Sequence, residues 1–178
     1  KEKEKYSNSK SSNSGNWISK GPINTPIILS NNKKRGNGRV NCIAFDPIDE
    51  NIIWIGSPAG GLWKSIDGGS NWTTNTDNLP VMGVSHIAID PINNQIMYIV
   101  TGDANATDTY SIGILKSIDG GSTWNTTGLS YTVDQEKTVN KVLINPNHTD
   151  SLIAATNSNL MISSDGGTTW ATTGIIGR

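Results

Sequence analysis

The chain has 178 residues, of which 34% are hydrophobic and 19 are glycine, a composition typical of a turn-rich β protein. Its 14 basic and 15 acidic residues leave a formal net charge of −1, so we expect neither nucleic acid nor membrane lipid as a partner. No apolar run approaches the ~20 residues of a membrane span, and a single cysteine, Cys42, excludes an internal disulfide framework.

Residues 1–16, at the start of the chain, are poor in apolar side chains. They alternate Lys with Glu and then run through Ser and Asn, which indicates a disordered linker. There is neither an initiating Met nor a signal peptide, so we expect a mature form or an internal fragment of a longer protein. Residues 17–38, which contain Trp17 and Gly21-Pro22, are expected to form an entry strand that closes a ring of repeats.

Three repeating units occupy the rest of the chain. Their expected bounds are 39–80, 81–131 and 132–178. Each unit opens with an apolar-rich run that ends in Asp-Pro or Asn-Pro, which predicts a strand stopped by a turn. These opening runs are 40–47, 84–91 and 139–146. Two more apolar runs follow in each unit, and a last strand comes after the motif described next, so each unit is expected to hold four strands.

An eight-residue motif, Ser-x-Asp-Gly-Gly-x-x-Trp, recurs once in each unit and is called the box below. The three boxes span 65–72, 117–124 and 163–170. Asp-Gly-Gly offers residues that tolerate positive φ, and the Asp carboxylate can accept hydrogen bonds from backbone N–H groups further along the turn. The residues expected to build these turns are Ser65, Asp67, Gly68, Gly69, Trp72, Ser117, Asp119, Gly120, Gly121, Trp124, Ser163, Asp165, Gly166, Gly167 and Trp170. The motif therefore predicts a tied hairpin between the third and fourth strands.

The spacing of these signals predicts the fold class. Repeats of ~40–50 residues with four strands each are typical of propeller blades. We therefore expect an all-β fold, a β-propeller segment of about three four-stranded blades with box hairpin turns. From the Pro turn to the box Asp, the middle unit has 29 residues (Asp90 to Asp119), whereas the first unit has 21 (Asp46 to Asp67). The extra residues fall in 101–111, between the second and third strands.

This inserted loop is the candidate binding site of the chain. It contains two acids, several hydroxyls and an aromatic ring, and loops on rigid scaffolds are where binding residues concentrate. We predict Asp103, Asp108 and Tyr110 as ligand-contacting residues for a protein or a glycan. Two other interpretations stay open, namely a solvated loop whose acids cap turns and a Ca²⁺ site built from oxygen ligands.

No cofactor or metal site is expected elsewhere. His86 and His148 lie in different units with no Cys or second His near them in the sequence. No glycine-rich loop opens a helix, because no helical periodicity is present. Cys42 lies within a predicted strand and is expected to be a small buried hydrophobe.

The boxes resemble the Asp-box, or bacterial neuraminidase repeat, found in sialidases, sortilin-type propellers, xyloglucan-cleaving glycoside hydrolases and a photosystem assembly factor. The stretches 38–47 and 56–65 resemble the start of a sortilin-like propeller, as in large surface proteins exported by the bacterial type IX secretion system. This resemblance covers roughly residues 17–178 and implies the fold. It does not by itself imply an activity, because enzymes and non-enzymes share the repeat.

The enzymes among these proteins have known catalytic residues, and the matching positions of this chain can be compared with them. The resemblance to sialidases implies three carboxylate-binding arginines, and this chain has only Arg35, Arg39 and Arg178. The resemblance to xyloglucan-cleaving enzymes implies a catalytic Asp before a Gly-Gly-aromatic turn, where this chain has Pro58. Proline cannot act as a general acid or base. No catalytic residue is therefore expected in this chain.

We interpret the sequence as a non-catalytic interaction or scaffold module of a secreted or cell-surface bacterial protein. The expected partners are the rest of a longer chain, which completes the propeller, and a protein or glycan at the cell surface or in the secretion machinery. The alternative is the N-terminal part of a secreted glycoside hydrolase, xyloglucanase-like or sialidase-like, whose catalytic residues lie downstream. A sortilin-like propeller with a protein ligand in its central channel is a third possibility.

Overall fold

The computed structural model describes residues 38–105 and 109–176. The chain divides into two units, Lys1–Asn37 and Gly38–Arg178, and every described residue lies in the second. The linker predicted for 1–16 and nearly all of the entry segment predicted for 17–38 fall outside the described residues.

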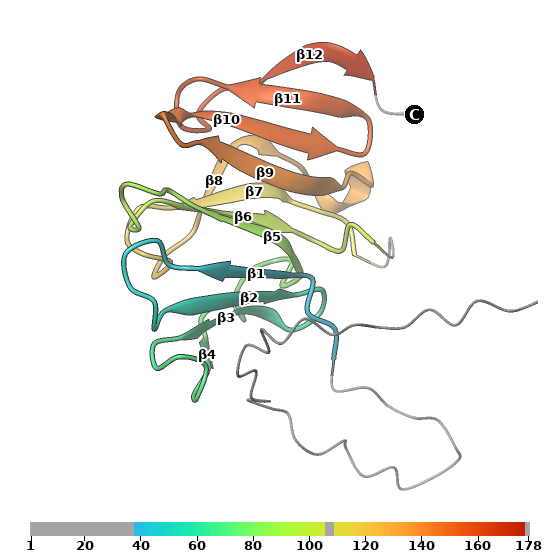
Figure 1. Ribbon diagram of the computed structural model, residues 1–178. Coiled ribbons are helices and arrows are strands. Elements are labelled where there is room, and N and C mark those ends of the chain that lie inside the picture. The colour runs from blue at the N-terminus through green and yellow to red at the C-terminus, as the bar shows by residue number, and fades with distance from the viewer. Residues whose placement is uncertain (1–37, 106–108, 177–178) are drawn as a thin grey trace, which may run out of the picture. The chain divides into compact units, whose positions relative to one another are not determined.

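The described residues form twelve β-strands in three four-stranded antiparallel sheets, which confirms the predicted all-β propeller fold class (Figure 1). The first sheet contains β1 (Cys42–Phe45), β2 (Ile53–Ser57), β3 (Gly61–Ser65) and β4 (Thr73–Thr74). The second contains β5 (Val84–Ile89), β6 (Met97–Thr101), β7 (Gly113–Ser117) and β8 (Asn125–Ser130). The third contains β9 (Val139–Asn145), β10 (His148–Thr156), β11 (Asn159–Ser163) and β12 (Ala171–Ile176). A 3₁₀-helix, η1 (Val133–Gln135), joins the second sheet to the third.

Each sheet is a simple meander, because every connection inside a sheet joins neighbouring antiparallel strands. The three sheets lie face to face in chain order (Figure 1). Their first strands are neighbours, since β5 contacts both β1 and β9. The middle sheet is therefore covered on both of its faces, while each outer sheet has one face against the middle one.

Alternation along the strands builds two separate cores. In β6, Met97 and Ile99 pack with the first sheet, whereas Tyr98 and Val100 pack with the third. All four side chains are buried, as expected for a strand with both faces covered. Cys42 packs against the first of these cores, and burial raises the pKa of its thiol to about 11.

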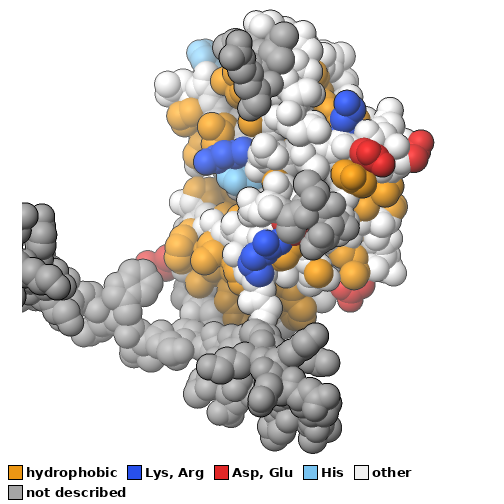
Figure 2. Space-filling model, turned by 90° about the vertical axis from the view of Figure 1, so that its right-hand side faces the viewer, with side chains coloured by type: hydrophobic (Ala, Val, Ile, Leu, Met, Phe, Trp, Pro, Cys, Tyr) orange, Lys and Arg blue, Asp and Glu red, His pale blue; other side chains and the backbone are white. Residues whose placement is uncertain are grey.

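The two ends of the sheets differ in what they carry. The turns β1–β2 and β3–β4, with their equivalents in the second sheet, lie together on the left in Figure 1, and this is the end that holds the boxes. The β2–β3 turn, the long β6–β7 loop and η1 lie at the opposite end. Figure 2 shows that opposite end, where Lys and Arg side chains lie among hydrophobic ones.

Candidate functional site

The three boxes share one hydrogen-bond network, illustrated by the second. The Ser117 hydroxyl donates to Asp119 Oδ1 at 2.7 Å and accepts from the backbone N–H of Gly121 at 2.8 Å. Asp119 in turn accepts from the backbone N–H of Thr123 at 2.8 Å and from the Thr123 hydroxyl at 2.6 Å. Equivalent bonds tie the first and third boxes. The box acids are thus engaged in holding their own turns.

These hydrogen bonds stabilise the ionised carboxylates. They lower the pKa of all three box acids from 3.8 to about 2. The largest cause is the backbone N–H of Asn71 for Asp67, and the hydroxyl of Thr123 for Asp119. An acid with a lowered pKa is a poor proton donor at neutral pH, so the boxes are unsuited to general acid catalysis.

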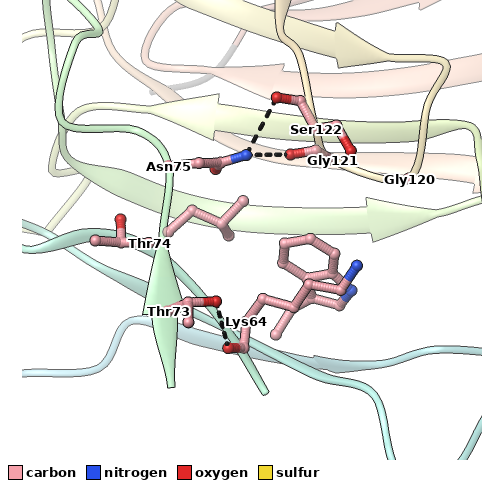
Figure 3. Close-up of a pocket in the computed structure, with 9 residues that line it drawn as sticks. Lys64, Thr73, Thr74, Asn75, Gly120, Gly121 and Ser122 are labelled. Atoms are coloured by element: carbon pink, nitrogen blue, oxygen red, sulfur yellow. Dashed lines mark hydrogen bonds between the residues drawn. The ribbon is translucent and has the colours of Figure 1, made fainter. Parts of the chain in front are cut away.

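Each of the first two sheets contacts the box of the sheet that follows it. Trp54 on β2 is buried, and its ring lies against Gly121 of the second box, where an added Cβ would stand 2.5 Å from the indole. Lys64 on β3 places its ammonium 4.7 Å from the centre of the same ring. Asn75 donates its side-chain N–H to the carbonyl oxygens of Gly121 at 2.6 Å and Ser122 at 3.3 Å (Figure 3). A recess of about 100 Å³ remains between these groups.

The second and third sheets repeat this arrangement with different side chains. Tyr98 takes the place of Trp54 in β6, and its hydroxyl donates to the Gly166 carbonyl at 3.1 Å. Lys116 donates to the same carbonyl at 2.9 Å, and its ammonium lies 5.4 Å from the centre of the Tyr98 ring. We call the aromatic ring and the lysine of one sheet, together with the box glycine of the next sheet that they contact, the inter-sheet clamp. Sequence reasoning missed the clamp, although the recurring aromatic and Lys in the second and third runs were visible.

The inserted loop joins β6 to β7 at the opposite end, and its base is fixed by hydrogen bonds. Asp103 is buried and forms an ion pair with Arg39, which lies 64 residues earlier in the chain. The Ser85 hydroxyl donates to the Gly102 carbonyl at 2.6 Å and accepts from the backbone N–H of Ala104 at 3.1 Å. Asp103 therefore points into the structure and toward Arg39, a position in which it organises the loop.

The three predicted contact residues occupy different settings. Asp103 is buried, Tyr110 is half-buried, and Asp108 lies outside the described residues. Arg39 is occupied by Asp103, and the other two arginines, Arg35 and Arg178, also lie outside the described part of the chain.

No group of three or more His, Cys, Asp or Glu side chains within residues 38–105 and 109–176 is placed to hold a metal ion. The same residues include no helix whose length and apolar character would suit a bilayer crossing.

Comparison with known proteins identifies the family. The model of the family Sortilin-Vps10, described as sortilin and neurotensin receptor 3, matches residues 60–174. The chain belongs to the sortilin/Vps10 family. The matched range takes in all three boxes and most of the three sheets.

Several proteins resemble this sortilin/Vps10 chain over part of their length. A xyloglucanase of Hypocrea jecorina (strain QM6a) is 30% identical over 105 residues, which are 55% of this chain and 12% of the enzyme. The structure of an ancestral GH74 enzyme matches with a TM-score of 0.62 at 21% identity, covering 76% of this chain and 18% of that one. A structure of YCF48 bound to D1 peptide matches with a TM-score of 0.55 at 18% identity, covering 76% of this chain and 40% of that one. The chain thus spans only about a tenth of the curated enzyme that it matches.

Proposed function

We propose that this chain supplies consecutive blades of a larger β-propeller and that these blades are a non-catalytic interaction module of a secreted or cell-surface bacterial protein. The observation that carries the proposal is the contrast between the middle sheet and the two outer faces. Ile87 on β5 is buried against the first sheet, with 6% of its surface exposed, whereas Ile43, its equivalent on β1, is 62% exposed. The neighbouring Phe45 is 64% exposed.

The outer face of the third sheet shows the same contrast. Trp54 and Tyr98 are buried under the next sheet, whereas Ile153, at the equivalent position of β10, is 46% exposed. Ile162 and Leu143, on the strands beside it, are 43% and 51% exposed. Large exposed apolar side chains on a sheet face that the next sheet covers in the other two units indicate a surface that another blade covers.

The acids of the described chain support a role without catalysis. A glycosidase needs a pair of carboxyl groups that flank the scissile bond. Here the box acids hold their own turns, Asp103 is paired with Arg39, and Asp46 accepts two hydrogen bonds from Asn94. Pro58 occupies the position for which the resemblance to xyloglucan-cleaving enzymes implies an Asp.

A second candidate function is favoured by one observation, the 30% identity to a xyloglucanase. In that case the chain is part of a glycoside hydrolase, and its blades would line a polysaccharide-binding cleft while the catalytic acids lie elsewhere. The stretches 38–47 and 56–65 resemble sortilin-like propellers of proteins exported by the type IX system, and YCF48, a protein of similar fold, binds a peptide; both points support the module instead. Its partner would then be a protein or a glycan outside the cell.

Affinity electrophoresis of the purified chain in gels containing xyloglucan, together with a reducing-end assay, separates the two candidates. A module whose partner is a protein or another glycan predicts unchanged mobility in xyloglucan and no release of reducing ends. Retardation by xyloglucan, but not by an unrelated soluble polysaccharide, would favour the glycoside hydrolase. Release of reducing ends by the chain alone would refute the non-catalytic proposal.

A further inference from the structure

Four isoleucine side chains are exposed to solvent at the box end of the first two sheets. Ile48 and Ile92 follow the Asp-Pro turns between β1 and β2 and between β5 and β6, and Ile66 and Ile118 are the second residues of the first two boxes. Their exposed fractions lie between 65% and 72%. Single exposed apolar residues are ordinary, but four large ones on neighbouring turns of the same end call for a function. We call these four residues the isoleucine platform.

The four turns that carry the platform are joined by hydrogen bonds. The Gly68 N–H of the first box donates to the Asn51 carbonyl at 3.0 Å, which fixes that box to the β1–β2 turn. The Asn94 amide donates to Asp46 at 3.0 Å, which fixes the β5–β6 turn to the β1–β2 turn. The second box is fixed to the β5–β6 turn by Gly120 N–H, which donates to the Gln95 carbonyl at 3.0 Å. The platform is thus pre-organised, which lowers the entropy that a partner must overcome on binding.

The fold does not need isoleucine at these positions. The third sheet has the same pair of turns, with Asn147 where Ile48 and Ile92 stand and Ser164 where Ile66 and Ile118 stand. Its box nevertheless forms the same network, and Gly166 N–H donates to the Asp150 carbonyl at 2.9 Å, as in the other sheets. The isoleucines therefore add an apolar surface without stabilising the turns beneath them.

The charged residues within the four platform turns are all acidic. The four turns span 46–52, 66–72, 90–96 and 118–124 and contain no Lys or Arg. Their acids are Asp46, Asp49, Glu50, Asp67, Asp90 and Asp119. The nearest lysines along the chain, Lys64 and Lys116, lie over the Trp54 and Tyr98 rings of the clamps. Of the two, Lys64 is near enough to Asp46 to help lower the pKa of that carboxyl. The net charge of −1 for the whole chain thus conceals an acidic, apolar end.

We propose that the isoleucine platform docks a polypeptide segment that combines aliphatic side chains with Lys or Arg. Its aliphatic groups bury the four isoleucines. Its cations face the carboxylates that reach the surface, those of Asp49, Glu50, Asp67 and Asp119, and these steer the encounter. The proposal rests on the interaction module proposed above and names its partner. It assigns the partner to the box end, away from the inserted loop.

Binding of synthetic peptides to the full chain, followed by biolayer interferometry, tests the platform. The probe is a short peptide that alternates Leu with Lys, and the comparison peptides alternate Ser with Lys and Leu with Glu. The platform variant carries Ile48→Asn, Ile66→Ser, Ile92→Asn and Ile118→Ser, which copy the residues of the third sheet. The matched control carries Phe45→Ser and Ile153→Ser on the outer faces of the sheets.

We expect the Leu-Lys peptide to bind, to bind more weakly at high salt, and to lose roughly tenfold or more in affinity with the platform variant. Unchanged circular dichroism and thermal unfolding of that variant would show that its fold is intact. Equal binding by the Ser-Lys or Leu-Glu peptide, or a loss caused by the control variant in place of the platform variant, would overturn the proposal. So would a change in sedimentation of the platform variant without peptide, because a second copy would then be the occupant. None of these results bears on xyloglucan retardation, so the proposed function is tested separately.

Discussion

Gly121→Ala tests the contact by which one sheet covers the box of the next. The residue has a φ of +80°, so any Cβ brings a conformational cost of about 1–2 kcal/mol. The added Cβ would also stand 2.5 Å from Cη2 of Trp54, a ring that is buried. Such overpacking costs about 1–3 kcal/mol. We expect the free energy of unfolding, from urea titrations followed by far-ultraviolet circular dichroism, to fall by the sum of these costs, about 2–5 kcal/mol.

The first box supplies the matched control. Gly69 is the equivalent residue, with a φ of +86°, but its added Cβ would meet its nearest neighbour, the Trp72 ring, at an ordinary 3.5 Å. Gly69→Ala should therefore cost only the conformational term of about 1–2 kcal/mol. In a Trp54→Phe background, the cost of Gly121→Ala should fall toward this value. Equal costs for the two glycine substitutions in the natural background would refute the clamp as an inter-sheet contact.

Three further predictions concern acid, the inserted loop and the outer faces. The pKa values of the box acids are lowered to about 2, so the free energy of unfolding should be constant above about pH 5 and fall from about pH 4 to 2. Thr123→Val removes the hydroxyl that donates to Asp119, so this variant should show a smaller fall in acid titrations. Arg39→Met should leave the Asp103 carboxylate buried without its partner and lower the free energy of unfolding in urea by about 1 kcal/mol. An unchanged free energy would show that the ion pair does not stabilise the fold. Phe45→Lys should reduce concentration-dependent self-association in sedimentation velocity, and an unaltered profile would argue against an uncovered blade face.

Much of the fold could be predicted because the chain repeats its own signals. Each Pro turn and each box marks a strand end, so three copies indicate four strands per sheet even where a strand is weak. The box turn was predictable for the same reason, since the hydrogen bonds of Asp119 lie within five residues. The length of the fourth strand was not predictable. β4 has only two residues, because Asn75 turns away to the box of the next sheet.

The contacts between repeating units could not be predicted from the sequence pattern. Alternation shows that Trp54 and Tyr98 share a face of their strands, but it does not show that a glycine of the next box lies beneath each ring. The inserted loop shows the same limit for the candidate site. Two acids in a polar loop suggest ligand contacts, whereas Asp103 is buried and paired with Arg39, which comes from the segment before β1. Asp103, Asp108 and Tyr110 stay a prediction as binding residues.

The inter-sheet clamp gives the stack of sheets a direction. The ring and the ammonium always come from the earlier sheet and the glycine carbonyl from the later one, so the two faces of a sheet are not interchangeable. A two-fold symmetric pair would join two identical sheet faces, and no aromatic ring of one copy would then contact a box of the other. Further blades of the proposed propeller would therefore add head-to-tail, a type of contact that ends only when a ring closes. In the third sheet Ile153 and Ile162 replace the aromatic and the lysine, so a blade placed on that face, as the proposed function requires, would pack on apolar side chains without a clamp.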